Sequence, residues 1–277
     1  MTRAERIANM IGVVVPFLGL IAAIVLLWQS WVDWVDLGIM AGLYLLYGMG
    51  ITVGYHRLLT HRAFKTHKPV EYGFAVLGSM GLQGGVLDWV ADHRKHHAHT
   101  DQEGDPHSPH GHGGGLKGAL SGLYYAHMGW LFDRAGQAPP ERYAKDLYED
   151  RGMQVIQRSF WLFVLAGFLM PFGLGWAIGG TVADGLTGAL WGGAVRIFLL
   201  HHVTWSINSV CHFFGRRRFA VEDHSTNVFW LALPSFGESW HHNHHAFPRS
   251  AQHGLRWWEV DPTAWLIGAQ GGGTAVD

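Results

Sequence analysis

The sequence has little charge and almost no cysteine, and both shortages narrow the class of protein. Only 15% of its 277 residues are Asp, Glu, Lys or Arg, against about 25% in a typical soluble domain. The single cysteine, Cys211, excludes an intramolecular disulfide framework and any metal site built from thiolates alone. With 20 basic and 21 acidic residues, the formal net charge is −1, so the overall field does not favour a nucleic-acid partner.

The sequence features of three well-known metal or cofactor sites are also missing. There is no HExxH motif, which disfavours a zinc protease, and no pair of Glu-x-x-His motifs, which disfavours a carboxylate-rich di-iron bundle. No GxGxxG fingerprint follows an expected strand. If the chain catalyses a redox reaction, we therefore expect its electrons to come from a separate donor protein.

Histidine is the residue in excess, with 20 copies, as many as Lys and Arg together. Two HxxHH motifs occur, and a looser HxxxxH pair precedes both: His56 and His61, then His93, His96 and His97, then His241, His244 and His245. Positions i, i+3 and i+4 of a helix share one face, so we expect the imidazoles of each HxxHH motif to point at a common spot. These eight histidines over-supply a tetrahedral zinc, so the count favours two metal ions, chosen from Zn, Cu, Fe and Ni.

The other histidines are interpreted differently. His242 directly follows His241 and is rotated about 100° from it around a helix, so we predict that it is not a ligand. Isolated histidines are usually surface or hydrogen-bonded residues, and six are expected to have such structural or incidental roles. They are His67, His110, His112, His127, His224 and His253.

Hydrophobic residues make up 48% of the chain and gather in long runs. Four runs approach the roughly 20 residues with which a helix crosses a ~30 Å hydrocarbon core: residues 10–28, 37–55, 160–178 and 186–205. Residues 56–158 and 206–277 are more polar and are expected to form a cytosolic helical cap. The sequence thus predicts one domain over residues 1–277, an all-α integral membrane protein with four transmembrane helices.

A fifth uncharged run, residues 72–87, is short and rich in glycine, and as a helix it would span only about 24 Å. If it crossed the membrane, the first HxxHH motif would lie on the opposite side from His56 and His61. We therefore expect a helix that lies in the membrane interface or under the cap.

Basic residues are distributed unevenly between the two sides of this predicted bundle. The connections 29–36 and 179–185 contain no Lys or Arg, and every basic residue except Arg196 falls on the other side. The positive-inside rule then puts both termini and the histidine motifs in the cytoplasm. Arg196 lies within the fourth run, where a functional or paired role and a packing or snorkelling role both stay open.

Four stretches around the histidines form a longer pattern: residues 56–61 (HRLLTH), 92–97 (DHRKHH) with 104–108 (GDPHS), 204–212 (TWSINSVCH) and 237–248 (GESWHHNHHAFP). Together they resemble the histidine boxes, the DPH turn and the NxxxH element of the membrane acyl desaturases, the stearoyl-CoA desaturase-like family. The resemblance covers most of residues 56–262.

The resemblance implies a site with two iron ions, nine histidine ligands and one asparagine, Asn208, which reaches an iron through water. The implied ligands are His56, His61, His93, His96, His97, His212, His241, His244 and His245. O₂ is the implied co-substrate, because removing hydrogen from an unactivated methylene needs an oxidant that iron can form from O₂ and redox-inert zinc cannot. A bent acyl tunnel is implied at Gln83, Trp89 and Thr204, with Trp205 nearby; without the resemblance, plain packing would be the simpler interpretation.

Two positions bear on the acyl carrier. Where animal acyl-CoA enzymes of this family have an Arg before the first HxxHH box and an Arg-Lys pair after a GWL element, this chain has Ala91 and Arg134-Ala135. The pattern resembles bacterial and plant-type Δ9 enzymes more closely, so acyl-CoA and acyl-lipid substrates both stay open. A bacterial inner membrane or a plasma membrane is the implied location.

The implied activity is O₂-dependent insertion of a cis double bond, at Δ9, into a saturated C16 to C18 acyl chain. Two electrons per turnover would come from a separate ferredoxin or cytochrome-type donor. A di-iron hydroxylase of alkanes or lipids is an alternative, which product analysis distinguishes. A histidine-rich metal transporter or storage protein is a third, although transporters tend to place ligands near the bilayer midplane and these clusters lie past the helix ends.

Overall fold

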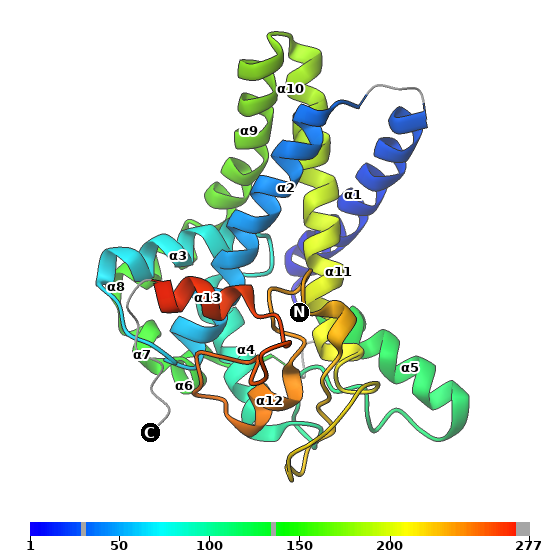
Figure 1. The fold of residues 1–277 in the computed structure, drawn as a ribbon, viewed down its shortest axis with the longest axis vertical. Coiled ribbons are helices and arrows are strands. Elements are labelled where there is room, and N and C mark those ends of the chain that lie inside the picture. Colours follow the sequence, from blue (N-terminus) through cyan, green and yellow to red (C-terminus); the bar gives the residue numbers. More distant parts are fainter. Residues whose placement is uncertain (29–31, 134–136, 270–277) are drawn as a thin grey trace.

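The computed structural model describes residues 1–28, 32–133 and 137–269, and all its regular elements in these ranges are helices. Long helices stand side by side in the upper part of Figure 1, and short helices and loops gather below them. Two isolated bridges, which join residue 227 to residues 216 and 240, are the only strand-like pairings in the described part of the chain. The all-α prediction is confirmed.

Three helices of the described residues are long and apolar enough to cross a membrane. They are α1 (Arg3–Trp28), α2 (Trp34–Met49) with its continuation η1 (Gly50–Thr60), and α9 (Phe160–Gly179). The fourth predicted span, 186–205, is helical throughout, as α10 (Val182–Ala189), η3 (Leu190–Val195) and α11 (Arg196–Ser209). This last run is less apolar and is not among the three.

The second predicted span ends later than the sequence indicated. We expected the helix to stop at Tyr55 with His56 and His61 beyond it, but it continues as a π-helix to Thr60. The His61 N–H donates to the His56 carbonyl at 3.1 Å, which extends the π-helical pattern to the last turn. His56 therefore lies inside a rigid helix, and His61 caps it.

The segment 72–87 is not one helix, so this prediction was wrong in its bounds. It contributes to α3 (Lys68–Met80) and to α4 (Val86–His99), which a turn at residues 81–85 separates. Leu82 and Gly84 have φ values of 56° and 104° there, and such left-handed conformations break a helix. In Figure 1, α3 lies crosswise below α9 and beside α2.

The lower part of the molecule is built from short elements. They are α5 (Gly115–His127), η2 (Gly129–Phe132), α6 (Pro140–Tyr143), α7 (Lys145–Tyr148), α8 (Arg151–Arg158), η4 (Phe229–Leu231), α12 (His241–Ala246) and α13 (Pro262–Ala269). Loops join them, including the long connection from residue 210 to residue 228. These loops carry several of the polar residues described below.

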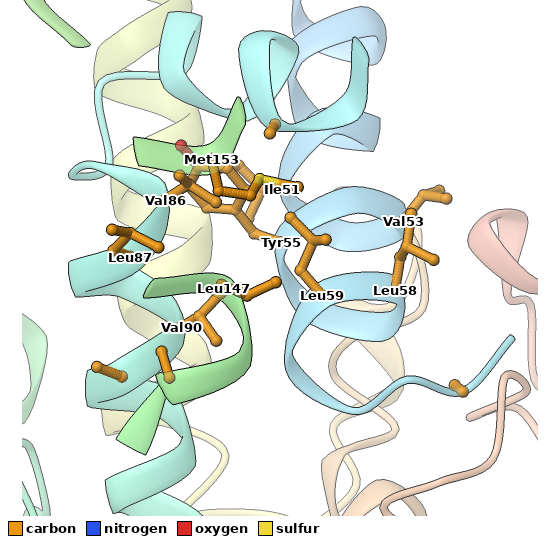
Figure 2. Packing of buried hydrophobic residues seen from close by; sticks show 14 of the residues in the cluster. Ile51, Val53, Tyr55, Leu58, Leu59, Val86, Leu87, Val90, Leu147 and Met153 are labelled. Carbon is orange, nitrogen blue, oxygen red and sulfur yellow. The ribbon is translucent and has the colours of Figure 1, made fainter. Parts of the chain in front are cut away.

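A buried apolar cluster joins η1 to α4 and sets their distance (Figure 2). Tyr55 and Leu59 of η1 face Val86 and Val90 of α4, and Met153 of α8 closes the cluster. The Tyr55 hydroxyl also forms a buried hydrogen bond of 2.9 Å with Ser79 on α3. This packing brings the HxxxxH pair beside the first HxxHH motif.

Arg196 makes a contact within the bundle, one of the roles that the sequence left open. Its side chain is fully buried and donates to the carbonyls of Gly192, Met80 and Gly167 at 3.0, 3.3 and 3.3 Å. The guanidinium lies over the Tyr47 ring, 4.5 Å from its centroid. Arg196 thus connects α11 to α2, α3 and α9.

We predict that Gly50→Ala destabilises the protein by about 1–3 kcal/mol, because overpacking displaces the backbone. A Cβ at Gly50 would lie 2.5 Å from the Gly78 nitrogen and 2.6 Å from the Leu77 carbonyl carbon of α3. Gly42→Ala is the matched control, because a Cβ there meets nothing within 4 Å. Thermal unfolding of the detergent-purified variants checks this, and equal unfolding midpoints would contradict the tight α3–η1 contact.

Candidate metal centre

The two HxxHH motifs lie on helices, as predicted, but each motif divides its rings between two groups. On α4, His93 and His97 join one group of nitrogens and His96 joins another. Positions i+3 and i+4 are about 100° apart around a helix, so their rings diverge to either side of the shared face. The expectation of one common spot per motif was therefore too simple.

The first group contains five histidines whose candidate ligand nitrogens all lie within 4.8 Å of one another. They are His56, His61, His93, His97 and His244. The His97 Nε2 lies 3.2 Å from the His93 Nε2 and 3.0 Å from the His244 Nε2. Five imidazoles from η1, α4 and α12 thus converge on one small volume.

The second group contains four histidines under the same distance criterion, His96, His212, His241 and His245. The His241 Nε2 lies 2.9 Å from the His212 Nε2 and 3.0 Å from the His245 Nε2. All nine histidines that the resemblance implies are therefore members of one group or the other. Asn208, the tenth implied residue, lies near the C-terminal end of α11, four residues before His212.

Carboxylates lie behind both groups and contact the outer nitrogen of several rings. The Nδ1 atoms of His96, His212 and His245 lie 2.9 Å from Asp105, Asp101 and Asp223, respectively. The His56 Nδ1 contacts Glu238. Metal-bound histidines usually donate their other N–H to such a group, which fixes the tautomer and the ring orientation.

Electrostatics favour the neutral form of six of these rings and the ionised form of Asp105. Burial lowers the pKa of His61, His93, His97, His241, His244 and His245 well below the usual value, and repulsion between neighbouring imidazoles lowers it further. Neutral imidazole is the form that binds a metal. Burial alone would raise the pKa of Asp105, but the adjacent His96 holds it well below its usual range, so Asp105 stays ionised.

Unpaired nitrogens at the centre of the groups test whether a metal fits. The Nε2 atoms of His56, His61 and His96 are buried and have no hydrogen-bond partner. Each such atom costs about 1–3 kcal/mol unless something binds it. An all-imidazole donor set suits iron, copper, nickel or zinc, so the residues fit two metal positions.

Arg57, which the sequence did not single out, holds the carboxylate behind His56. It is fully buried, and its Nε and Nη2 donate to Glu238 at 3.1 and 2.9 Å, while Nη1 donates to Asp261 at 3.0 Å. Glu238 precedes His241 by three residues in the sequence, a spacing that could have identified it. The guanidinium therefore orients Glu238, and Glu238 orients the His56 ring.

Of the four expected tunnel residues, Trp89 contacts a histidine of the first group. Gln83 donates from Nε2 to the Thr204 hydroxyl at 2.8 Å, which ties the α3–α4 turn to α11. Trp89 stacks on His93 of the first group with ring centroids 5.0 Å apart. Trp205 is buried, and the centroid of its ring lies 4.9 Å from that of the His201 ring.

Two other predictions about single positions can be compared with the structure. His242 lies outside both groups, and its ring accepts a 2.9 Å hydrogen bond from the Phe219 N–H. His253, expected to be structural or incidental, is buried against the first group, with its ring centroid 4.4 Å from that of His244. Ala91 is buried on α4, and Arg134-Ala135 lie outside the described residues.

Helices long and apolar enough to cross a membrane, together with histidine groups that could hold metal ions, are features of the class of metal-dependent membrane proteins. A comparison with protein-family models then finds a match to the model described as "Fatty acid desaturase" over residues 29–273. The chain belongs to the fatty acid desaturase family and is an oxidoreductase. This membership confirms the resemblance and favours an enzyme over a metal transporter or storage protein.

Curated relatives agree with this assignment. The chain is 44% identical over 250 residues to the hex-5-enoyl-[acyl-carrier protein] acetylenase of Moorena producens (strain JHB), covering 90% of this chain and 78% of that protein. It is 40% identical over 254 residues to the sn-1 stearoyl-lipid 9-desaturase of Anabaena variabilis, covering 90% and 86%. It is 40% identical over 238 residues to the Delta-9 acyl-lipid desaturase 1 of Arabidopsis thaliana, covering 84% and 71%.

We predict that Asp105→Asn weakens metal binding about 10–100-fold, as loss of an outer carboxylate usually does. The amide removes the negative charge that faces the His96 Nδ1 at 2.9 Å. Glu103→Gln is the matched control, because Glu103 is exposed in the same turn. Chelator competition on the purified proteins measures the affinity, and equal affinities in the two variants would show that Asp105 does not support the site.

Proposed function

We propose that this enzyme inserts a cis double bond at Δ9 into a saturated C16 to C18 acyl chain, using O₂, two iron ions and two external electrons. The observation that carries the proposal is the meeting of nine imidazoles in two adjacent groups. Relatives named stearoyl-lipid 9-desaturase and Delta-9 acyl-lipid desaturase support the position of the double bond and the chain length.

In this proposal each histidine group holds one iron, and Asn208 assists at the second group through water. Bound iron supplies the activation of O₂ that removal of hydrogen from an unactivated methylene requires. The protein's own task is to hold the imidazole rings in the orientation that binds the metal. The contacts with Asp101, Asp105, Asp223 and Glu238 serve this purpose.

We propose an acyl lipid as the substrate. Ala91 is uncharged and fully buried, so it offers a CoA phosphate no positive charge. The Gln83–Thr204 hydrogen bond and the Trp89 ring beside His93 are proposed to shape the bend of the acyl tunnel. The relatives named acyl-lipid or stearoyl-lipid desaturases support this choice.

Membrane placement completes the proposal. The run from residue 182 to residue 209 is proposed as a fourth crossing beside the three longer helices, and both termini and the metal centre face the cytoplasm. A ferredoxin or cytochrome-type protein would then deliver electrons from that side.

The proposed chemistry is tested by the lipids of a host that otherwise lacks Δ9 unsaturation. Expression of this enzyme should produce C16 and C18 chains with a cis double bond located at Δ9 by mass spectrometry. His245→Ala should give no detectable product, because it removes a ligand from the second group. His242→Ala is the control and should retain product in proportion to the amount of folded protein, since its ring lies outside both groups.

Three results would contradict this proposal. Hydroxylated lipids instead of unsaturated ones would favour the hydroxylase. A triple bond formed from an existing double bond would favour an acetylenase activity, like that of the Moorena relative. Equal loss of product in His242→Ala and His245→Ala, with both proteins folded, would show that the ligand set is wrong.

The proposed sidedness predicts opposite labelling of two introduced cysteines. Cys211 is buried, so the native protein should react little with a membrane-impermeant maleimide. Ala183→Cys, exposed in the first turn of α10, should label in intact cells, whereas Lys117→Cys, exposed on α5, should label only after lysis. Labelling of both variants in intact cells, or of both only after lysis, would contradict the proposed topology.

A further inference from the structure

His253 lies outside every motif that predicted the metal centre, yet its side chain is part of the same buried volume. It is 1% exposed and lies on the connection between α12 and α13. Its ring centroid is 4.4 Å from that of His244 and 5.5 Å from that of His56. Both of these neighbours belong to the first histidine group.

The ring nitrogens of His253 are unusual because both are buried without a hydrogen-bond partner. Native proteins contain few such atoms, and each costs about 1–3 kcal/mol. The Nδ1 of His244 is a further buried nitrogen without a partner, and the two rings are in contact. Unpaired nitrogens on these two adjacent rings indicate that they form hydrogen bonds when metal is bound at the first group.

Glu238 is the nearby acceptor. The His253 Nδ1 lies 3.7 Å from the Glu238 Oε2, and the same carboxylate contacts His56 and accepts hydrogen bonds from Arg57. A shift of about 0.5 Å would bring the His253–Glu238 pair to hydrogen-bond distance. Burial would raise the pKa of Glu238, but His56 and Arg57 keep it lowered, so the carboxylate stays an acceptor.

We propose that His253 is a positioning residue for the first metal position, which links Glu238 to His244. Its Nδ1–H donates to Glu238, and its other nitrogen accepts the Nδ1–H of His244. A neutral imidazole has one donor and one acceptor, so a single tautomer serves both bonds. The inference rests on the proposed function in requiring that the first group binds a metal.

Loss of this link should affect the two metal positions unequally. His244 has no carboxylate contact of its own, whereas His96, His212 and His245 of the second group each have one. Removing an outer-layer partner typically weakens metal binding about 10–100-fold. The weakening should therefore be confined to the first position.

The test compares His253→Phe, which keeps a ring without nitrogens, with His253→Gln, which restores a donor and an acceptor. The probe is iron alone, titrated into the purified full-length protein and followed by metal analysis and by Mössbauer spectroscopy of ⁵⁷Fe. We expect His253→Phe to bind iron at the first position about 10–100-fold more weakly than wild type. One of the two iron signals should then be lost. His253→Gln should recover part of this affinity.

His242→Phe is the matched control, because His242 is equally buried and lies on α12, the helix that carries His244, but belongs to neither group. It should retain both irons, and thermal unfolding verifies that each variant is folded. Retention of both irons by His253→Phe at wild-type affinity would overturn the inference alone. If His253→Phe and His242→Phe both lost iron equally from both positions, the inference would also be overturned. His253 would then have only a structural role.

Wild-type protein that binds no iron at either position would overturn the proposed function and this inference together. Two irons in wild type with unchanged binding in His253→Phe would leave the proposed function standing. The two failures are therefore distinguishable in one titration series.

Discussion

The structure depends on the close approach of imidazole nitrogens in a buried volume. Nitrogens such as the Nε2 atoms of His212 and His241, 2.9 Å apart, cannot all be satisfied by one another, because a neutral ring has one donor and one acceptor. A cation bound between them would resolve this conflict. The rest of the fold can be understood as the support that holds η1, α4, α12 and the end of α11 at the required distance.

Two kinds of interaction provide this support, apolar packing between helices and polar contacts to the histidine rings. Apolar packing of Tyr55 and Leu59 against α4 fixes the helices, and ionised carboxylates fix the rings that the helices carry. Because Asp105 and Asp223 lie on loops, their contacts with His96 and His245 also order those loops. The same contacts therefore serve both stability and site geometry, and a change in one carboxylate is expected to affect both.

The sequence predicted those features of the site that depend on the spacing of neighbouring residues. The HxxHH spacing predicted helices at residues 93–97 and 241–245, and these are α4 and α12. The division of each motif between two groups, the buried Arg57 and the place of His253 depend on contacts between segments about 200 residues apart, such as Arg57 with Glu238, and no local pattern encodes them. The π-helical extension to Thr60 was missed because a 3.6-residue period does not reveal a change in hydrogen-bond register.

The central claim is that the nine histidines form two separate metal positions. Diffraction from crystals of the iron-loaded protein, recorded on both sides of the iron absorption edge, tests this most directly. We predict two anomalous peaks, one among His56, His61, His93, His97 and His244 and one among His96, His212, His241 and His245. A single peak shared by both groups, or peaks away from them, would contradict the claim.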